Sequence, residues 1–421
     1  MDILINSLGG GGAERQVALL TSHFPVDKVF ALENEISYEI DRSKLVALSR
    51  HNKKTSAIWK MICLPLYCWR LRRSILFSTP LGARRPPRCA SHPPRLRNFL
   101  LARSDALEKD TSPHSNECVP IVLSFLERSN FVNILSKLFF RHKAFVSVRI
   151  QPSLAYDKGL KRFEKLLIRW LYPFAEKIIV NSQGIKHDLV THFRFKEEKI
   201  VVIENALGIE DIVQRAALDL EEELKPIFKN PVIITVGRHI HQKGQWQLIR
   251  VFSELKKHIP ALRLVIVGEG PLTEELRGIG RELKLREGED LYFLPFRKNP
   301  FQLIARASLF VLPSLYEGFP NVLIEAMACG TPVASTDCWS GPREILAPDT
   351  GHPKKNADAE NTMYGVLLPL GDFKDTEKKW VHALLEILKK PSEETIIRAK
   401  TRIKDFSLQT VLEKWRSTIR L

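Results

Sequence analysis

The chain contains, between two apolar runs, the stretch Leu312-Pro-Ser-Leu-Tyr-Glu-Gly-Phe-Pro-Asn-Val-Leu-Ile-Glu-Ala-Met-Ala-Cys-Gly-Thr-Pro-Val333. Its pattern predicts a strand that ends at Leu312, a loop rich in Gly and Pro, and a helix that begins near Asn321. Free backbone N–H groups at that helix N-terminus would suit a phosphate or a sugar hydroxyl. The stretch therefore predicts a ligand-binding loop in an α/β domain.

Two glutamates stand on either side of the helix start. Glu325 would lie one turn into the helix among apolar residues, where a carboxylate is costly to bury without a partner. Ribose hydroxyls would be natural partners, and the alternative is an ordinary exposed helix face. Glu317 would lie in the loop, where a purely structural or helix-capping carboxylate is the alternative. Both residues are candidates for a ligand site.

Strand and helix patterns alternate along the whole chain. In the first half a glycine-rich turn joins the strand at 2–6 to a helix at 14–23, as in a doubly wound α/β domain. A second helix is predicted at 158–172, with its apolar positions at Leu160, Phe163, Leu167 and Leu171. Further strands are predicted in the first half at 120–125, 144–148, 177–180 and 199–203.

The second half contains a similar series. A short acidic helix is predicted at 219–224, in a linker region. Strands follow at 232–236, 263–267, 291–293, 309–312 and 332–334, and a last helix is predicted at 406–421. Two such series imply two α/β domains with a cleft between them. Ligands in sheets of this kind bind beyond the carboxyl ends of the strands.

The first strand of the second series leads into Val236-Gly-Arg-His-Ile-His-Gln-Lys-Gly244. Arg238 and Lys243 could both reach one diphosphate, arginine as a planar fork and lysine as a point charge. A helix that begins near Gln245 would point its N-terminus into the same space. A solvated basic loop is the alternative interpretation.

The formal net charge of +16 over 421 residues indicates a polyanionic partner, or simply a basic soluble surface. The chain lacks the aromatic-interleaved basic motifs, helix-turn-helix pattern and zinc spacing of specific nucleic-acid binders. Its six cysteines form no Cys-x-x-Cys pair, which favours reduced thiols in the cytosol. The chain shows neither a signal peptide nor a run of about 20 apolar residues. A cytosolic or peripheral membrane protein is expected.

Two further segments stand out. Residues 55–75 mix Trp59, Tyr67 and Trp69 with four cations, which suits an anionic membrane interface, although a core helix with a basic outer face is equally compatible. Pro65 would interrupt a single helix there. The segment 78–116 is rich in Pro and Arg and is predicted as an exposed, disordered insert or a sequence artefact.

These motifs together resemble those of retaining glycosyltransferases of family 4. The resemblance rests on Glu317 and Glu325 with seven residues between them, the Arg238–Lys243 loop, and Ser340-Gly-Pro-Arg-Glu-Ile345. It extends to Gly9-Gly-Gly-Gly-Ala-Glu-Arg15, to the segment 122–133 and to Val146-Ser-Val-Arg149. The resemblance covers most of the chain apart from about 78–116.

The resemblance implies a GT-B fold, α/β with two Rossmann-like domains whose parallel sheets face a central cleft. The domains would be 1–205 for the acceptor, 206–400 for the nucleotide sugar, and a terminal helix, 401–421, that packs back on the first domain. Arg238 and Lys243 would neutralise the donor diphosphate as it leaves. Glu325 would accept hydrogen bonds from the ribose, and Glu317 would contact the transferred sugar.

The remaining implied site residues are backbone elements and one cation. The loop that wraps the sugar and phosphate would consist of Gly318, Phe319, Pro320 and Asn321, while Gly11 and Gly12 would let the first domain approach the diphosphate or acceptor. Arg149 stands where many relatives have a histidine that reaches the donor sugar, and Asn205-Ala206 replaces the usual Asn-Gly or Asn-Pro.

The implied reaction uses a nucleotide sugar, with a UDP-sugar expected, and a lipid-linked or glycan acceptor. The family needs no metal, in agreement with the absence of an Asp-x-Asp motif. The enzyme would act at the cytoplasmic face of the inner membrane, on an anionic surface. The alternatives are a catalytically inactive family member, a basic nucleic-acid-binding protein, or a GT-B epimerase or phosphorylase.

Overall fold

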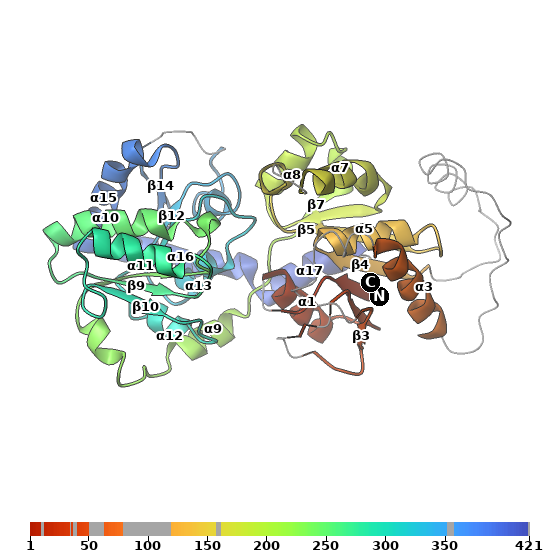
Figure 1. Cartoon of the computed structure of the whole chain (residues 1–421), viewed down its shortest axis with the longest axis horizontal. Helices are drawn as coiled ribbons and strands as arrows, with labels where there is room; N and C mark the ends of the chain where they lie inside the picture. The colour runs from red at the N-terminus through yellow and green to blue at the C-terminus, as the bar shows by residue number, and fades with distance from the viewer. Residues whose placement is uncertain are drawn as a thin grey trace. The chain divides into compact units, whose positions relative to one another are not determined.

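The computed structural model describes residues 1–9, 12–33, 35–36, 40–49, 63–78, 119–156, 161–351 and 358–419. They form two compact units, which are Met1–Asn181 with Ile185–Val202 and Ser182–Gly184 with Ile203–Leu421 (Figure 1). The insert expected at 78–116 lies outside the described residues, apart from Ser78.

The first unit is built on a seven-stranded sheet in the order β3-β2-β1-β4-β5-β6-β7, and every pair in it is parallel. Strand β1 lies between β2 and β4, so the direction of the chain's progress across the sheet reverses there. The strands are β1 Asp2–Ile5, β2 Val29–Ala31, β3 Leu45–Ala47, β4 Ile121–Phe125, β5 Lys143–Val148, β6 Lys177–Val180 and β7 Ile200–Val202.

Helices cover this sheet because their buried faces meet the apolar strands. Helix α5 contacts both α3 and α7, so the three lie side by side. Their buried side chains share one core with strand residues such as Val122 and Val146. The helices are α1 Gly12–His23, α3 Leu64–Ser78, α5 Glu127–Ser136, α6 Pro152–Ala155, α7 Lys161–Leu171, η1 Tyr172–Phe174, α8 Gln183–Thr191 and η2 Glu197–Lys199.

The second unit has a seven-stranded sheet in the order β10-β9-β8-β11-β12-β14-β13, parallel except for the β13–β14 pair. Here β8 lies between β9 and β11, which again marks a switch point. The strands are β8 Val232–Val236, β9 Arg263–Val267, β10 Leu291–Leu294, β11 Leu309–Leu312, β12 Val333–Thr336, β13 Glu360–Asn361 and β14 Val366–Leu368.

Helices lie on both faces of this second sheet (Figure 1). Along β8, Val232 and Ile234 join one hydrophobic cluster, whereas Ile233 joins the other, as alternating strand side chains must. The helices are α9 Ile209–Ala216, η3 Lys225–Lys229, η4 His241–Lys243, α10 Gln245–His258, α11 Thr273–Glu282, α12 Phe301–Ile304, α13 Asn321–Ala328, α14 Pro342–Leu346, α15 Phe373–Lys389, α16 Glu393–Arg402, η5 Ile403–Phe406 and α17 Leu408–Ile419.

The α/β fold with two parallel sheets is as predicted, but two local predictions are wrong. The acidic segment 219–224 forms no helix, and Pro226 disfavours helical backbone just before it. In line with the prediction that Pro65 would interrupt a single helix over 55–75, α3 begins at Leu64 and has Pro65 as its second residue, where a missing N–H costs nothing; residues 50–62 lie outside the described residues. Phe163 of α7 points away from the core and is exposed.

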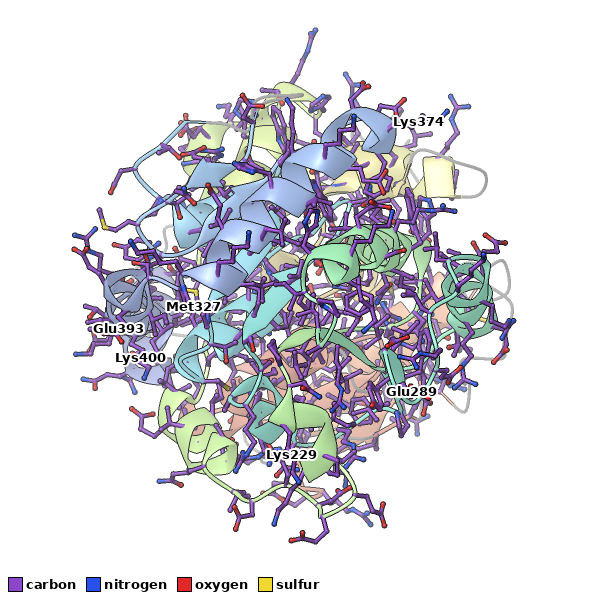
Figure 2. The ribbon with its side chains drawn as sticks, turned by 90° about the vertical axis from the view of Figure 1, so that its left-hand side faces the viewer. Lys229, Glu289, Met327, Lys374, Glu393 and Lys400 are labelled. Atoms are coloured by element: carbon purple, nitrogen blue, oxygen red, sulfur yellow. The ribbon has the colours of Figure 1, made fainter. Side chains whose placement is uncertain are left out.

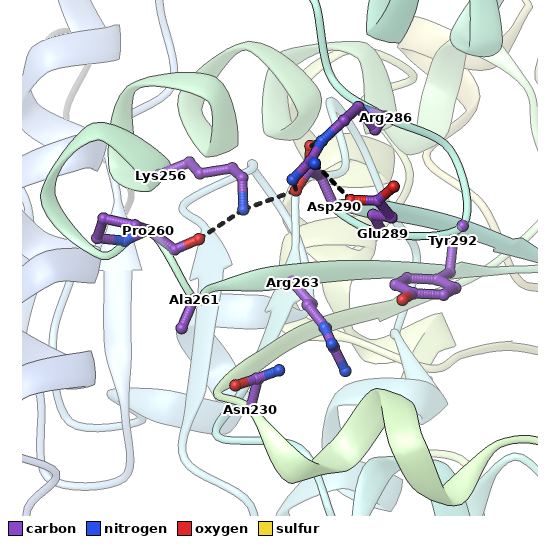
Figure 3. Close-up of a pocket in the computed structure, with 10 residues that line it drawn as sticks. Asn230, Lys256, Pro260, Ala261, Arg263, Arg286, Glu289, Asp290 and Tyr292 are labelled. Carbon is purple, nitrogen blue, oxygen red and sulfur yellow. Dashed lines mark hydrogen bonds and ion pairs between the residues drawn. The ribbon is translucent and has the colours of Figure 1, made fainter.

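A small hollow of about 200 Å³ lies at the amino-terminal edge of the second sheet (Figure 3). Its cations are already held by acceptors. Lys256 Nζ lies 2.8 Å from Asp290 Oδ1 and donates to the carbonyl of Pro260, and Arg286 Nε lies 3.0 Å from Asp290 Oδ2. Although burial alone would raise the pKa of Asp290, these hydrogen bonds lower it well below its ordinary value. The network therefore stabilises the fold and lies opposite the carboxyl edge of the sheet.

Replacing Asp290 by Asn should lower the free energy of unfolding at neutral pH by about 2 kcal/mol, because two cations lose their charged partner. Because the pKa of Asp290 is lower in the folded than in the unfolded state, its carboxylate stabilises the fold fully above the unfolded pKa of about 3.9. This stabilisation is lost as the pH falls towards the folded pKa. The deficit of the Asp290→Asn variant should therefore shrink below about pH 4 in urea unfolding. The exposed Glu289, changed to Gln, is the control and should cost about 0.5 kcal/mol or less. A pH-independent deficit would contradict the assignment.

Candidate functional site

The candidate site begins at the carboxyl end of β8. The chain leaves the strand at Gly237, forms the short turn η4 and enters α10 through Gly244. Gly244 has φ of 60°, and a Cβ built there would lie 2.0 Å from the carbonyl oxygen of Pro313. Only glycine fits, because the backbone is left-handed and a second loop touches it.

The N-terminus of α10 has no side-chain cap. The Gln247 N–H already donates to the Gly244 carbonyl, so the N–H groups of Gln245 and Trp246 are the ones available to an anion, and the helix dipole favours one there. This agrees with the helix start predicted near Gln245. Arg238, on the outgoing loop, is exposed.

A second loop, 313–320, follows β11, which pairs directly with β8. Two hydrogen bonds join the loops, from the Leu315 N–H to the Gln242 carbonyl and from Gln242 Nε2 to the Tyr316 carbonyl, each 2.8 Å long. Residues that are 74 positions apart in sequence thus lie together at the switch point of the sheet.

The two loops also bring opposite charges into contact. Lys243 Nζ lies 2.6 Å from Glu317 Oε1, with the lysine side chain 20% exposed and the glutamate 8%. The sequence predicted both residues as site residues but not that they would pair. The pair holds a cation beside the uncapped start of α10 and keeps its own carboxylate neutralised.

Ser340 fixes the glutamate loop from the other side. Its hydroxyl lies 2.8 Å from the carbonyl oxygen of Glu317 and 3.0 Å from that of Gly318. The neighbouring Gly341 has φ of 93°, and a Cβ there would lie 2.5 Å from Cδ of Pro320. Ser340 had been noted only within a family motif, and nothing in the sequence indicated this contact.

The rest of the predicted donor loop leads into helix α13, which begins at Asn321. Glu325 is 7% exposed, so the exposed-face alternative is wrong. Pro320 precedes the helix without a side-chain cap, so Glu317 does not cap it either. Asn321 begins the helix and accepts a 2.7 Å hydrogen bond from Asn205 Nδ2. Phe319 is buried and packs edge-on against Phe406, with the ring centroids 5.4 Å apart.

The loop after β9 supports the first loop by backbone contact. Gly268 has φ of 139°, and a Cβ at Gly270 would lie 2.3 Å from the carbonyl oxygen of His239. His239 is buried, its Nδ1 lies 2.8 Å from Thr273 Oγ1, and burial lowers its pKa. The segment Gly268-Glu-Gly-Pro271 thus supports the loop after β8.

The predicted residues of the first unit lie at the carboxyl edge of its own sheet. Gly11 is outside the described residues, and Gly12 is the exposed first residue of α1. Arg149 follows β5, with its guanidinium 4.9 Å from the centre of the Phe125 ring. Burial lowers the pKa of Arg149 to about 9, which leaves the side chain charged at neutral pH.

The turn after β4 in this unit shows backbone strain. Leu126 has φ of 71°, a region that favours glycine and is strained for a leucine. The next turn is anchored by Asn6 Oδ1, which accepts hydrogen bonds from the N–H and hydroxyl of Ser129 at 3.0 and 2.8 Å. Arg128 forms an ion pair with Glu33 nearby. The sequence pointed to this segment only through its family resemblance.

Within the part of the chain that the structure describes, no group of three or more His, Cys, Asp or Glu side chains is arranged to hold a metal ion. Of the helices described, none is long and apolar enough to cross a membrane.

Two family models match the chain. The model described as Glycosyltransferase Family 4 matches residues 70–210, and the model described as Glycosyl transferases group 1 matches residues 219–363. The second match includes both loops of the candidate site. The two matches together cover segments of both structural units.

Similar proteins of known sequence match over most of their length. An uncharacterised glycosyltransferase of Methanocaldococcus jannaschii is 31% identical over 318 residues, which are 72% of this chain and 75% of that protein. The N-acetylgalactosamine-N,N'-diacetylbacillosaminyl-diphospho-undecaprenol 4-alpha-N-acetylgalactosaminyltransferase of Campylobacter jejuni is 30% identical over 371 residues, 86% of this chain and 88% of that enzyme.

A solved structure shares the fold. HepE of Anabaena, in complex with UDP and glucose, superposes with a TM-score of 0.66 over 100% of this chain and 99% of that chain, at 16% identity. This likeness concerns the fold alone.

The ion pair between Lys243 and Glu317 should couple the two side chains energetically. A double-mutant cycle of Lys243→Ala, Glu317→Ala and the double variant, read by urea unfolding, should give a coupling energy of about 1–3 kcal/mol. Each single variant leaves one charge partly buried, and the double variant removes both. Strictly additive losses would show that the pair contributes nothing in solution.

Proposed function

Because this chain belongs to family 4 of the glycosyltransferases and has the two-domain GT-B fold, we propose that it is a retaining enzyme that transfers a sugar from a UDP-sugar to a lipid-linked or glycan acceptor. The observation that carries the donor part of this proposal is the Lys243–Glu317 pair at the switch point of the second sheet. It lies beside an uncapped helix start, where a diphosphate has both a cation and backbone N–H groups to bind.

The diphosphate would be bound by Lys243, by Arg238 and by the first turn of α10. These groups stabilise the negative charge that develops on the phosphate oxygen as the bond to the sugar breaks. A diphosphate that attracts Lys243 would also release Glu317 to accept hydrogen bonds from the sugar. Glu325, buried one turn into α13, would accept hydrogen bonds from the ribose.

Retention follows if the acceptor hydroxyl attacks on the face that the diphosphate leaves. In that step the carbon–oxygen bond to the phosphate breaks, the bond to the acceptor oxygen forms, and the acceptor proton passes to the leaving phosphate oxygen. No protein nucleophile takes part, so Glu317 positions the sugar. The charge on the diphosphate is met by cations and N–H groups, so we propose that no metal ion is needed.

The acceptor is proposed from the chemistry of the relatives and from the charge of this chain. The Campylobacter jejuni enzyme acts, by its name, on a sugar carried by diphospho-undecaprenol. A net charge of +16 would favour an anionic membrane surface that carries such an acceptor. We therefore propose a peripheral enzyme at the cytoplasmic face of the inner membrane, in which Arg149 faces the donor sugar and Gly12 the diphosphate or the acceptor.

The donor proposal is tested by a thermal-shift screen against UDP-, GDP-, ADP- and TDP-sugars. A ligand that binds the folded state raises its melting temperature, so UDP-sugars should give the largest shift. The shift should persist when EDTA is added, because no metal is proposed. The anomeric configuration of the product, measured by NMR, should match that of the donor. A larger shift with another nucleotide would revise the donor, and an inverted product would exclude retention.

Replacing Lys243 by Ala should weaken donor binding by about 1.5–3 kcal/mol and lower turnover, because a charge-assisted contact to the diphosphate is lost. A radiolabelled sugar-transfer assay measures the turnover. Lys229→Ala is the matched control, since Lys229 is exposed (Figure 2). It precedes β8, so it lies at the edge of the sheet opposite Lys243. An unchanged transfer rate for the Lys243→Ala variant would remove the proposed role.

A further inference from the structure

Helix α7 exposes a row of large apolar side chains. Phe163 is 55% exposed, Leu166 49% and Trp170 59%. Their spacing of three and four residues places them on one face of the helix. Leu154, on the neighbouring α6, is 52% exposed as well. Such a row is unusual on a water-facing surface, where large exposed apolar side chains normally occur singly.

This row is separate from the face by which α7 packs on the protein. Ile168 and Leu171 are buried in the core of the first unit and anchor the helix there. The helix is therefore held in place without the exposed row. Phe163, Leu166 and Trp170 form an apolar surface that the fold itself does not use.

Cations run beside the apolar row. Arg162, Lys165 and Arg169 follow the same spacing of three and four residues, one position earlier in sequence. Arg162 and Arg169 are exposed, and among the residues that the structure describes neither forms an ion pair. A second copy of this face would bring these cations against like charges, whereas an anionic bilayer offers both headgroup phosphates and an apolar interior.

Helix α3 presents a smaller surface of the same kind. Leu66 and Trp69 are exposed, and the Arg73 guanidinium lies 5.6 Å from the centre of the Trp69 ring. Both α3 and α7 contact α5, so they cover the same face of the first sheet. Of the aromatic residues that suggested membrane contact in 55–75, Tyr67 is buried and Trp59 lies outside the described residues, so the exposed Trp69 is the one that has a counterpart on α7.

We propose that α7 is a membrane-docking element, with Phe163, Leu166 and Trp170 inserted at the headgroup–acyl boundary and Arg162 and Arg169 at the lipid phosphates. Aromatic side chains suit this depth because their bodies are apolar and their edges tolerate water. The proposal rests on the membrane-carried acceptor of the proposed function, and it names the surface that would bring the first unit to it.

The test is flotation of the full chain with vesicles of phosphatidylcholine alone and of equal parts phosphatidylcholine and phosphatidylglycerol. Wild-type protein should float with the anionic vesicles. The variant Phe163→Ser/Leu166→Ser/Trp170→Ser should bind them about a hundredfold more weakly, because the inserted area is lost. The variant Arg162→Gln/Arg169→Gln should lose about fivefold for each cation and should respond less to salt.

The matched control replaces three exposed apolar side chains of the second unit, as Val213→Ser/Leu218→Ser/Ile397→Ser. It should float like the wild type, and all variants should keep the wild-type melting temperature, since none of these side chains supports the core. Equal flotation of the wild type and the Phe163/Leu166/Trp170 variant would overturn the role of α7 alone. A wild-type chain that ignores anionic vesicles would overturn the membrane part of the proposed function too. Stabilisation by nucleotide sugars tests the donor site independently of either result.

Discussion

The second unit depends on one close backbone contact, between Gly244 and the carbonyl of Pro313. A Cβ at position 244 would lie 2.0 Å from that oxygen. Without a side chain there, the loops after β8 and β11 can touch, and Gln242 and Leu315 then join them by hydrogen bonds. The contact sets the start of α10 against the glutamate loop. The absence of a side chain at Gly244 therefore allows the close approach that brings Lys243 within reach of Glu317.

The sequence suggested Lys243 as a cation for a diphosphate, whereas in the structure Lys243 forms an ion pair with Glu317. A partly buried lysine without a counterion would be costly, because the interior cannot solvate it. Glu317 removes that cost in the unliganded protein, and Ser340 holds the glutamate backbone in place. A ligand must therefore compete with a carboxylate for Lys243. A dianionic diphosphate is suited to do so, while a single weak anion is not, and the pair would thus select for charge as well as for shape.

The sequence was sufficient where local pattern decides the structure. Strands such as 232–236 and 309–312 were predicted at their observed bounds, because short, nearly continuous apolar runs are typical of buried parallel strands. The helix start at Asn321 followed from the Gly and Pro before it. Contacts between distant segments, such as that of Ser340 with Glu317, could not be predicted from local sequence patterns. The short strands β2 and β3 were missed, since three residues give no period to recognise.

Helix α7 shows why periodicity alone could not assign its faces. Its sequence contains two overlapping apolar rows that share Phe163, one continued by Leu167 and Leu171 and the other by Leu166 and Trp170. Either row satisfies a helical period, and only packing against α5 decides which is buried. The core takes Ile168 and Leu171, so the other row must face outward at a cost in exposed apolar area. Exposing this row to water costs free energy, and contact with the apolar interior of a membrane would remove that cost. This is the physical basis for the proposal that the row docks on a membrane.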